Sequence, residues 1–304
     1  MSGDDETTTA AASDNCCASC GKAEVDDVEL KICDGCDLVS NYSDECKDDH
    51  RPGHEAKCKE RAAELRDEIL FRQPESTHLG DCPICFLPLP IDPQKSKLQY
   101  CCSKLICAGC SHANNLRHLQ ENMPRTCPFC RHPMPKSEKE FNKNLMKRVK
   151  ANDPVAMMQF GKELFLKGDH DGAFKYYTKA AELGDTMAHY NLSILYGKGE
   201  GVEKDETKEI YHLEEASIRG HPLARYNLGV YEESNGEIGR AVRHWIISAS
   251  LGLDESIYLL KMCYKEGLVR KDDFAAALRA HHAAINETKS PHREAAAKYY
   301  SVHD

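Results

Sequence analysis

The chain has 304 residues, of which 29% are charged and 41% are hydrophobic, and its formal net charge is -9. This length suits two or three domains, and this composition is typical of a globular protein. The acidic balance argues against a nucleic-acid partner, because such partners attract a basic face. No apolar run reaches the ~18 residues of a membrane-spanning helix, so we expect no membrane partner.

The first 15 residues, MSGDDETTTAAASDN, are acidic and polar. They lack the basic start and the apolar core of a secretory signal, and they offer few groups that a fold could bury. We therefore expect a disordered acidic tail over 1–15 and an intracellular location, either cytoplasmic or nuclear. Thiols stay reduced there, and closely spaced cysteines then bind metal more often than they form disulfides.

Cysteine spacing is the strongest signal in the chain. Of the 16 cysteines, all but Cys263 lie between Cys16 and Cys130. Most of them form Cys-x-x-Cys pairs, which place two thiolates on one tight turn at the spacing that tetrahedral zinc needs. The pairs are Cys17/Cys20, Cys33/Cys36, Cys82/Cys85, Cys107/Cys110 and Cys127/Cys130. They predict two metal-binding segments, 16–58 and 81–135. Both contain few large apolar residues, so the free energy of zinc binding would supply much of their folding stability.

The first segment, 16–58, resembles a MYND-type zinc finger, a family that holds two zinc ions through interleaved ligands. The matching residues are Cys17, Cys20, Cys33, Cys36, Cys46, His54 and Cys58. The resemblance implies one site formed by Cys33, Cys36, His54 and Cys58, and a second formed by Cys17, Cys20 and Cys46. Tyr42 stands where the second site needs its fourth ligand, and a neutral tyrosine is a poor zinc ligand. Either Cys16 or His50 could replace it. The family's implied role is binding of short peptide motifs.

The second segment, 81–135, resembles a RING finger. The matching residues are Cys82, Cys85, Cys102, Cys107, Cys110, Cys127 and Cys130. The resemblance implies a cross-brace in which Cys82, Cys85, Cys107 and Cys110 hold one zinc ion, and Cys102, Cys127 and Cys130 hold the other. Lys104 stands where the family has a ligating histidine, and a protonated lysine cannot ligate. Cys101 is the nearest spare thiol, and the further candidates are His112, His118 and His132. Both segments together would bind up to four zinc ions.

The residues around these cysteines also match the RING family. Ile84 and Pro128 match the apolar groove on which RING ubiquitin ligases dock a ubiquitin-conjugating enzyme. Arg131 matches the family's linchpin arginine, whose planar fork can bond two surfaces at once. The resemblance implies that the chain orients a thioester carried by another enzyme. We expect no catalytic side chain and no organic cofactor.

Helical patterns connect and follow the cysteine segments. Residues 59–80 are expected to be a helical linker, with Leu65, Ile69 and Leu70 at helical spacing and Pro74 after them. The lysine-rich segment 136–151 is expected to be a basic linker helix. Residues 291–304 are expected to be a C-terminal tail.

Between the linker helix and this tail, residues 152–290 contain an internal repeat. Its clearest copies are Ala188-x-Tyr-Asn-Leu and Ala224-x-Tyr-Asn-Leu, and weaker copies cover 156–164 and 256–264. Gly184, Gly220 and Gly252 follow the second helical segment of three copies, where a helix end favours a left-handed residue, and they give a period of 32–36 residues. A helix pair at this period buries its apolar face only by stacking on its neighbours. We therefore predict an all-α solenoid of about four repeats.

The repeat segment resembles the Sel-one-like repeats, a branch of the tetratricopeptide superfamily. This resemblance rests mainly on the copy that begins at Ala188 and contains the Gly-x-Gly-Val loop ending at Val202. It implies a concave surface that binds proteins, here an unknown protein substrate or peptide-motif partner.

The predicted fold class is mixed, with two small zinc-stabilised cross-brace modules followed by an all-α helical-repeat solenoid. We expect the two halves to fold separately, with a boundary near residue 150. The leading functional hypothesis is a ubiquitin-protein ligase, in which the RING module orients a ubiquitin-charged conjugating enzyme and the repeats recruit the substrate. The alternative is a non-catalytic zinc-binding adaptor or scaffold, which the departure at Lys104 favours.

Overall fold

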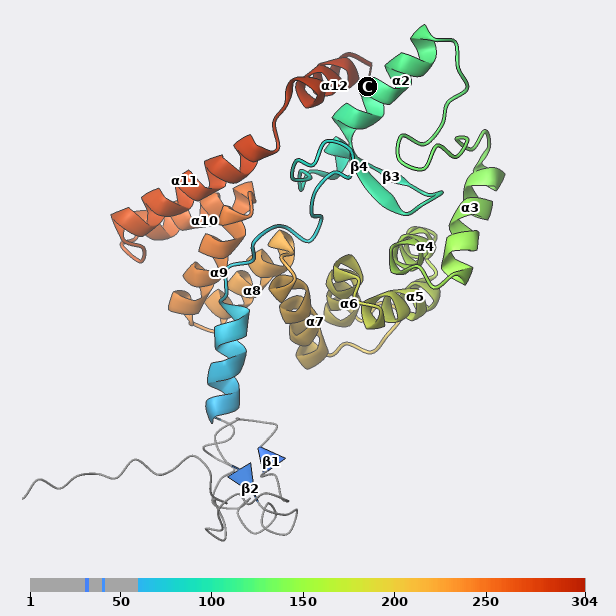
Figure 1. Ribbon diagram of the computed structural model, residues 1–304. Helices are drawn as coiled ribbons and strands as arrows, with labels where there is room; N and C mark the ends of the chain where they lie inside the picture. Colours follow the sequence, from blue (N-terminus) through green and yellow to red (C-terminus); the bar gives the residue numbers. More distant parts are fainter. Residues whose placement is uncertain (1–30, 33–39, 42–59, 304) are drawn as a thin grey trace, which may run out of the picture. The chain divides into compact units, whose positions relative to one another are not determined.

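The computed structural model describes residues 31–32, 40–41 and 60–303, and the chain divides into two compact units, Met1–Leu70 and Phe71–Asp304 (Figure 1). In the first unit, β1 (Lys31–Ile32) pairs antiparallel with β2 (Ser40–Asn41), and a helix covers 60–70. The expected acidic tail and the expected ligands and alternatives of the first cysteine segment lie outside the described residues. Those residues are Cys16, Cys17, Cys20, Cys33, Cys36, Tyr42, Cys46, His50, His54 and Cys58.

The second unit, Phe71–Asp304, begins with the second cysteine segment. A 3-10 turn, η1 (Pro93–Lys95), leads into β3 (Ser96–Gln99), which pairs antiparallel with β4 (Lys104–Cys107). Helix α2 (Ala108–Gln120) follows β4 directly. A small cluster of buried residues here consists of Cys82, Leu89, Ile106 and Cys107. Half of these residues are cysteines, so apolar burial alone gives this region little stability.

Helices form the rest of the second unit. They are α3 (Glu138–Lys150), α4 (Pro154–Leu166), α5 (His170–Glu182), α6 (Thr186–Lys198), α7 (Glu206–Ile218), α8 (Pro222–Ser234), α9 (Ile238–Ser250), α10 (Asp254–Lys265), α11 (Lys271–Glu287) and α12 (Pro291–His303). Helices α4 to α9 pack as successive pairs, each pair against the next, which confirms the predicted helical solenoid. Gly184, Gly220 and Gly252 all have positive φ, as the helix-end pattern predicts. Within the described part of the chain, no helix is both long and apolar enough to cross a membrane.

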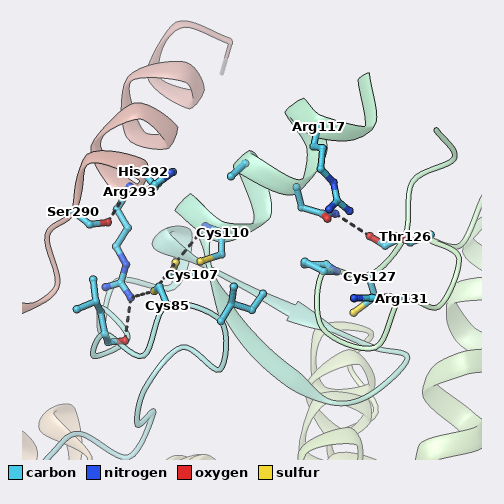
Figure 2. A pocket seen from close by; sticks show the side chains of 15 residues that line it. Cys85, Cys107, Cys110, Arg117, Thr126, Cys127, Arg131, Ser290, His292 and Arg293 are labelled. Atoms are coloured by element: carbon cyan, nitrogen blue, oxygen red, sulfur yellow. Dashed lines mark hydrogen bonds between the residues drawn. The ribbon is translucent and has the colours of Figure 1, made fainter. Parts of the chain in front are cut away.

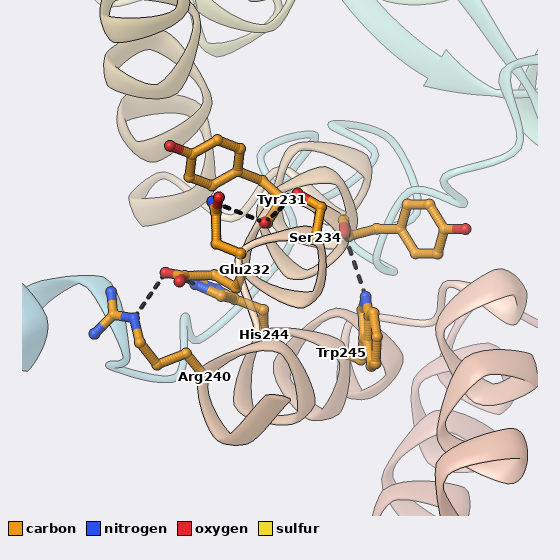
Figure 3. A network of polar contacts seen from close by, with 8 residues as sticks. Tyr231, Glu232, Ser234, Arg240, His244 and Trp245 are labelled. Atoms are coloured by element: carbon orange, nitrogen blue, oxygen red, sulfur yellow. Dashed lines mark hydrogen bonds and ion pairs between the residues drawn. The ribbon is translucent and has the colours of Figure 1, made fainter. Parts of the chain in front are cut away.

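Small residues at the helix contacts allow the solenoid to pack closely. Ala188 and Ala224, which open the two clearest repeat copies, are completely buried. On α8, Gly229 faces the buried Trp245 of α9, and an added Cβ would lie 2.3 Å from its ring nitrogen Nε1. That nitrogen donates a hydrogen bond to the carbonyl of Tyr226, at 3.3 Å (Figure 3). The indole is therefore held between two helices with no room for a larger residue at 229.

A polar network also joins α8 to α9. The Arg240 side chain pairs with Glu232 at 2.7 Å, beside the buried His244 (Figure 3). Burial, followed by the charges of nearby arginines, lowers the pKa of His244 to about 3. The imidazole therefore stays neutral and serves packing, not charge pairing, near pH 7.

The segment that precedes the second cysteine cluster packs along the repeats. The Phe71 ring lies 3.7 Å from the guanidinium carbon of Arg243 on α9. The His78 amide donates to the Gly220 carbonyl at 3.0 Å, and the His78 ring stacks on His221. These contacts cross the expected boundary near residue 150. The second cysteine segment and the repeats therefore share one compact unit.

The C-terminal segment differs from the expected tail. Residues 291–303 form α12, and this helix packs on α2 of the cysteine segment. Ser290 begins the helix, because its hydroxyl accepts the amide of Arg293 at 3.3 Å. The end of the chain therefore returns to the cysteine segment.

The Gly229–Trp245 contact gives a test of the solenoid packing. Gly229→Ala forces a methyl group onto the indole, so we expect a loss of about 1–3 kcal/mol in the free energy of unfolding. Gly239→Ala is the matched control, because no atom lies within 4 Å of its added Cβ. Chemical denaturation followed by circular dichroism should show a loss for Gly229→Ala alone. Equal stability of the two variants would contradict the close packing.

Candidate metal centres

Two tight turns of the same design carry four of the clustered thiols. We call residues 81–88 knuckle 1 and residues 126–133 knuckle 2. In knuckle 1 the amide of Phe86 donates to the Cys82 carbonyl at 2.9 Å, and in knuckle 2 the amide of Arg131 donates to the Cys127 carbonyl at 2.9 Å. Phe86 and Arg131 have φ values of 55 and 60 degrees. This left-handed residue after the second cysteine turns the chain back, so that both thiols of a knuckle point to one side.

The first cluster joins knuckle 1 to the start of α2. The Sγ atoms of Cys82, Cys85, Cys107 and Cys110 all lie within 4.8 Å of one another. Cys107 caps α2, because its sulfur accepts the amide of Cys110 at 3.4 Å. The amide of Cys107 itself donates to the Cys82 sulfur at 3.5 Å. Backbone amides thus face two of the sulfurs and favour their thiolate form.

The second cluster contains the vicinal pair Cys101 and Cys102, with Cys127 and Cys130 of knuckle 2. The Sγ atoms of Cys101 and Cys130 are 3.3 Å apart, and those of Cys102 and Cys127 are 3.9 Å apart. Among the alternatives left open for the fourth ligand, the structure therefore brings in the spare thiol Cys101. Ser103, which follows the pair, has a φ of 54 degrees and turns the chain into β4.

The other candidates lie elsewhere. In the described part of the chain, neither cluster includes a histidine. The His112 ring packs on Tyr299 of α12, with a centroid distance of 4.7 Å, and His118 contacts the Thr126 hydroxyl at 3.2 Å. The Lys104 ammonium lies over the Phe129 ring, 6.0 Å from its centroid. Lys104 thus occupies the surface of the module and contributes no ligand.

The distances fit a tetrahedral zinc site. Zinc–sulfur bonds of about 2.3 Å place the sulfurs of a tetrahedron about 3.8 Å apart. The Cys85–Cys107 separation is 3.8 Å and the Cys102–Cys127 separation is 3.9 Å. Four thiol ligands fill all positions of such a site, so it would have no open position for substrate. Both clusters could therefore hold a structural metal ion.

The proton affinities of the thiols agree with this interpretation. A hydrogen bond from the Cys107 thiol lowers the pKa of Cys82 to about 4, whereas burial raises the pKa of Cys110 to about 12. In the second cluster, burial raises the pKa of Cys102 to about 11. Burial thus opposes ionisation of Cys110 in the first cluster and of Cys102 in the second. A coordinated cation reverses this balance, because it deprotonates its thiol ligands.

A cavity of about 600 Å³ lies between the two clusters (Figure 2). Its lining includes Ile84 of knuckle 1, and Pro128 and Arg131 of knuckle 2. Helix α2 forms another side, and its Asn114 amide donates to the Thr126 carbonyl at 3.0 Å. The three residues that match the groove of RING ligases thus face one depression.

Sequence reasoning missed Arg293, which lines the same cavity (Figure 2). Its guanidinium reaches knuckle 1 from α12 and donates to the Cys85 sulfur at 3.4 Å. The Ser290–Pro291 dipeptide is a helix-start signal that could have revealed α12. No local pattern, however, indicates which distant residue that helix contacts.

The second cluster generates a direct prediction. Cys101→Ser should lower the zinc content of the purified chain by about one ion, because it removes one of four ligands. Cys263→Ser and His112→Ala should bind as much zinc as wild type, because neither residue belongs to a cluster. Metal analysis by mass spectrometry measures this difference. Unchanged zinc content in Cys101→Ser, or a loss in His112→Ala, would show that the ligand set is different.

Comparison with known proteins identifies the helical part. Residues 155–185, 186–221 and 222–253 match the family model of the Sel1 repeat. The fourth expected copy, which begins near Ser256, lies beyond these matches. In this structure α10 continues the helical packing there.

Two curated relatives are named DAP3-binding cell death enhancer 1. The chain is 26% identical to the Mus musculus protein over 182 residues, covering 47% of this chain and 36% of that protein. It is 23% identical to the Rattus norvegicus protein over 188 residues, covering 49% of this chain and 37% of that protein. The chain thus spans little more than a third of the length of these relatives.

Two solved structures are partly similar to this chain. A Sel1 repeat protein from Oxalobacter formigenes matches with 25% identity and a TM-score of 0.42, covering 49% of this chain and 46% of that protein. A protective antigen of uropathogenic Escherichia coli that displays an SLR fold matches with 27% identity and a TM-score of 0.40, covering 48% of this chain and 33% of that protein. The match to the family model shows that the segment 155–253, which spans helices α4 to α9, consists of Sel1 repeats.

Proposed function

We propose that this chain is a zinc-binding protein scaffold that acts as a RING-type ubiquitin ligase. The observation that carries the proposal is the convergence of Ile84, Pro128 and Arg131 on one cavity between two four-thiol clusters. These three residues come from two knuckles that are separated in sequence. Their meeting at one cavity requires both clusters to form, which ties the binding surface to the metal centres.

In this proposal zinc is held by the two clusters of the second unit. One ion would be bound by Cys82, Cys85, Cys107 and Cys110, and the other by Cys101, Cys102, Cys127 and Cys130. The ion supplies the positive charge that keeps four thiolates together and thereby fixes the knuckles. In the first cysteine segment, the MYND resemblance adds up to two further ions and a site for peptide motifs.

The surface around the cavity suits a protein partner. Ile84, which lines the cavity, is 37% exposed, and Phe86 of knuckle 1 and Phe129 of knuckle 2 are 77% and 44% exposed. Exposed apolar residues grouped on one module are typical of an interaction site. Arg117 and Arg131 in the lining add donors that can bond carbonyl or carboxylate oxygens of the partner. A ubiquitin-conjugating enzyme charged with ubiquitin is the partner that the RING resemblance implies.

The proposed chemistry takes place on the bound partner. A substrate lysine, as its neutral amine, forms an amide bond with the ubiquitin carbonyl carbon, and the carbon–sulfur bond of the thioester breaks. The sulfur of the conjugating enzyme leaves as a thiol after taking up the proton that the amine loses. The chain only positions the reactants. Ile84 and Pro128 would bind the conjugating enzyme, and Arg131 would restrain the thioester for attack. The Sel1 repeats would bind the protein that carries the lysine.

A non-catalytic adaptor is the second candidate. The name of the curated relatives describes a protein that binds another protein, DAP3, and the similarity covers about half of this chain. In an adaptor the same cavity and repeats would each hold a protein, without transfer of ubiquitin. Lys104 favours this reading, because it stands where RING fingers have a ligand.

Discharge of ubiquitin from a charged conjugating enzyme separates the two candidates. Arg131→Ala should slow discharge at unchanged zinc content, because Arg131 follows the last ligand but is not one. Ile84→Ala should weaken binding of the enzyme by about 1 kcal/mol or more, because it removes apolar contact area. Arg125→Ala is the matched control, since Arg125 is exposed near knuckle 2 but does not line the cavity. Discharge can be followed by single-turnover gel assays.

The adaptor candidate predicts a different outcome. A wild-type chain that is fully loaded with zinc, yet fails to discharge ubiquitin from a broad panel of conjugating enzymes, would refute the ligase. Equal rates for Arg131→Ala and Arg125→Ala would refute the proposed role of Arg131.

A further inference from the structure

The buried guanidinium of Arg293 connects the C-terminal helix to the first cluster. Arg293 is 9% exposed, although it is 208 positions away from Cys85 in the sequence. Its Nη2 donates to the Cys85 sulfur at 3.4 Å and to the Leu87 carbonyl at 3.0 Å. Its Nη1 donates to the Pro88 carbonyl at 2.6 Å. A single side chain thus donates hydrogen bonds to three residues of knuckle 1, which are Cys85, Leu87 and Pro88.

The same guanidinium also fixes the start of its own helix. Nη1 donates to the Thr288 carbonyl at 2.8 Å, in the turn that precedes α12. The planar fork of arginine can make such bonds in fixed directions, whereas a lysine ammonium cannot reproduce all of them. Knuckle 1 and the turn before α12 are therefore joined through Arg293.

A second contact brings α12 directly against the ligand turn. At Gly109, between Cys107 and Cys110, an added Cβ would lie 2.8 Å from the backbone nitrogen of Arg293. Further along the helix, the Lys97 ammonium lies 5.6 Å from the ring centroid of Tyr300, and the His112 ring packs on Tyr299. Helix α12 is thus docked on the module along its length, and Arg293 lies at the end beside the first cluster.

The positive charge of Arg293 beside the first cluster is expected to affect the affinity of that cluster for metal. Four thiolates around one divalent cation leave a net charge of about -2 in a partly buried site. A guanidinium donating to one of those sulfurs compensates part of that charge and orients the ligand. Groups that bond metal ligands from outside in this way typically change metal affinity by about 10- to 100-fold.

We infer that Arg293 is an outer-shell residue of the first cluster, through which zinc binding and docking of α12 stabilise each other. The inference rests on the zinc-binding part of the proposed function, and it is independent of ubiquitin transfer. Because energetic coupling between two sites is reciprocal, the factor by which docked α12 tightens zinc binding is also the factor by which zinc stabilises docked α12. The stability of docked α12 would then depend on whether zinc is bound at the first cluster.

The test uses the full chain and zinc alone. Arg293→Ala should weaken zinc binding at the first cluster about 10- to 100-fold, measured by competition with a chromophoric chelator. The second cluster should be unaffected. Arg293→Lys should fall between the variant and wild type, because it keeps the charge but not the fork. Lys298→Ala removes a cation from the exposed side of the same helix and should match wild type.

Hydrogen exchange of the α12 amides provides the reciprocal measurement. Removal of zinc from wild type should lower the protection of residues 294–303, because zinc and docked α12 stabilise each other. This arm needs no variant, so a folding defect in Arg293→Ala cannot hide the result. The inference would be overturned if Arg293→Ala bound zinc as tightly as wild type, or if removal of zinc left the hydrogen-exchange protection of α12 unchanged. Neither result would contradict the ligase proposal. A chain that binds no zinc at the first cluster would overturn both the inference and the zinc-binding proposal.

Discussion

Mutual repulsion among thiolates is the constraint on which the second unit depends. Eight cysteines lie in two groups of four, with sulfurs near the separation that a tetrahedral metal ion imposes. The apolar core between these groups is very small, so it cannot offset the cost of crowding ionised thiols in a partly buried site. A bound cation would remove that cost, and its binding free energy would then contribute to folding. The cavity between the knuckles is lined by thiols of both groups, Cys85, Cys107, Cys110 and Cys127.

The Sel1 repeats and the C-terminal helix α12 both contact the cysteine segment. The repeats have a conventional core, in which small residues such as Ala224 and Gly229 let helices approach and the Trp245 ring fills the space. The segment before knuckle 1 packs on α7 to α9 through His78 and Phe71, and α12 returns to the first cluster through Arg293. A rigid solenoid can thus support a module that has little apolar core of its own. Partner binding at the cavity and protein binding on the repeats would then share one framework.

Local patterns predicted much of this architecture, and long-range contacts account for what they missed. The repeats were predictable because their alanines and helix-ending glycines recur at a fixed period, and the knuckles because Cys-x-x-Cys is a local turn. The presence of Cys101, and not of a nearby histidine, in the second cluster was not predictable from the sequence. It depends on how the pairing of β3 with β4 positions the vicinal cysteines. Arg293 was missed because nothing in its own sequence neighbourhood indicates a thiol 208 positions away. Separate folding of the two halves stays a prediction, although one compact unit spans the expected boundary near residue 150.

We propose that the second unit holds two metal ions, each bound only by sulfur. Cadmium-113 NMR of the cadmium-substituted full chain tests it most directly, because the chemical shift separates all-sulfur sites from sites with a nitrogen ligand. The account predicts two all-sulfur resonances from this unit, one lost in Cys82→Ser and the other lost or strongly shifted in Cys101→Ser. A spectrum in which Cys101→Ser leaves every resonance unchanged would contradict it.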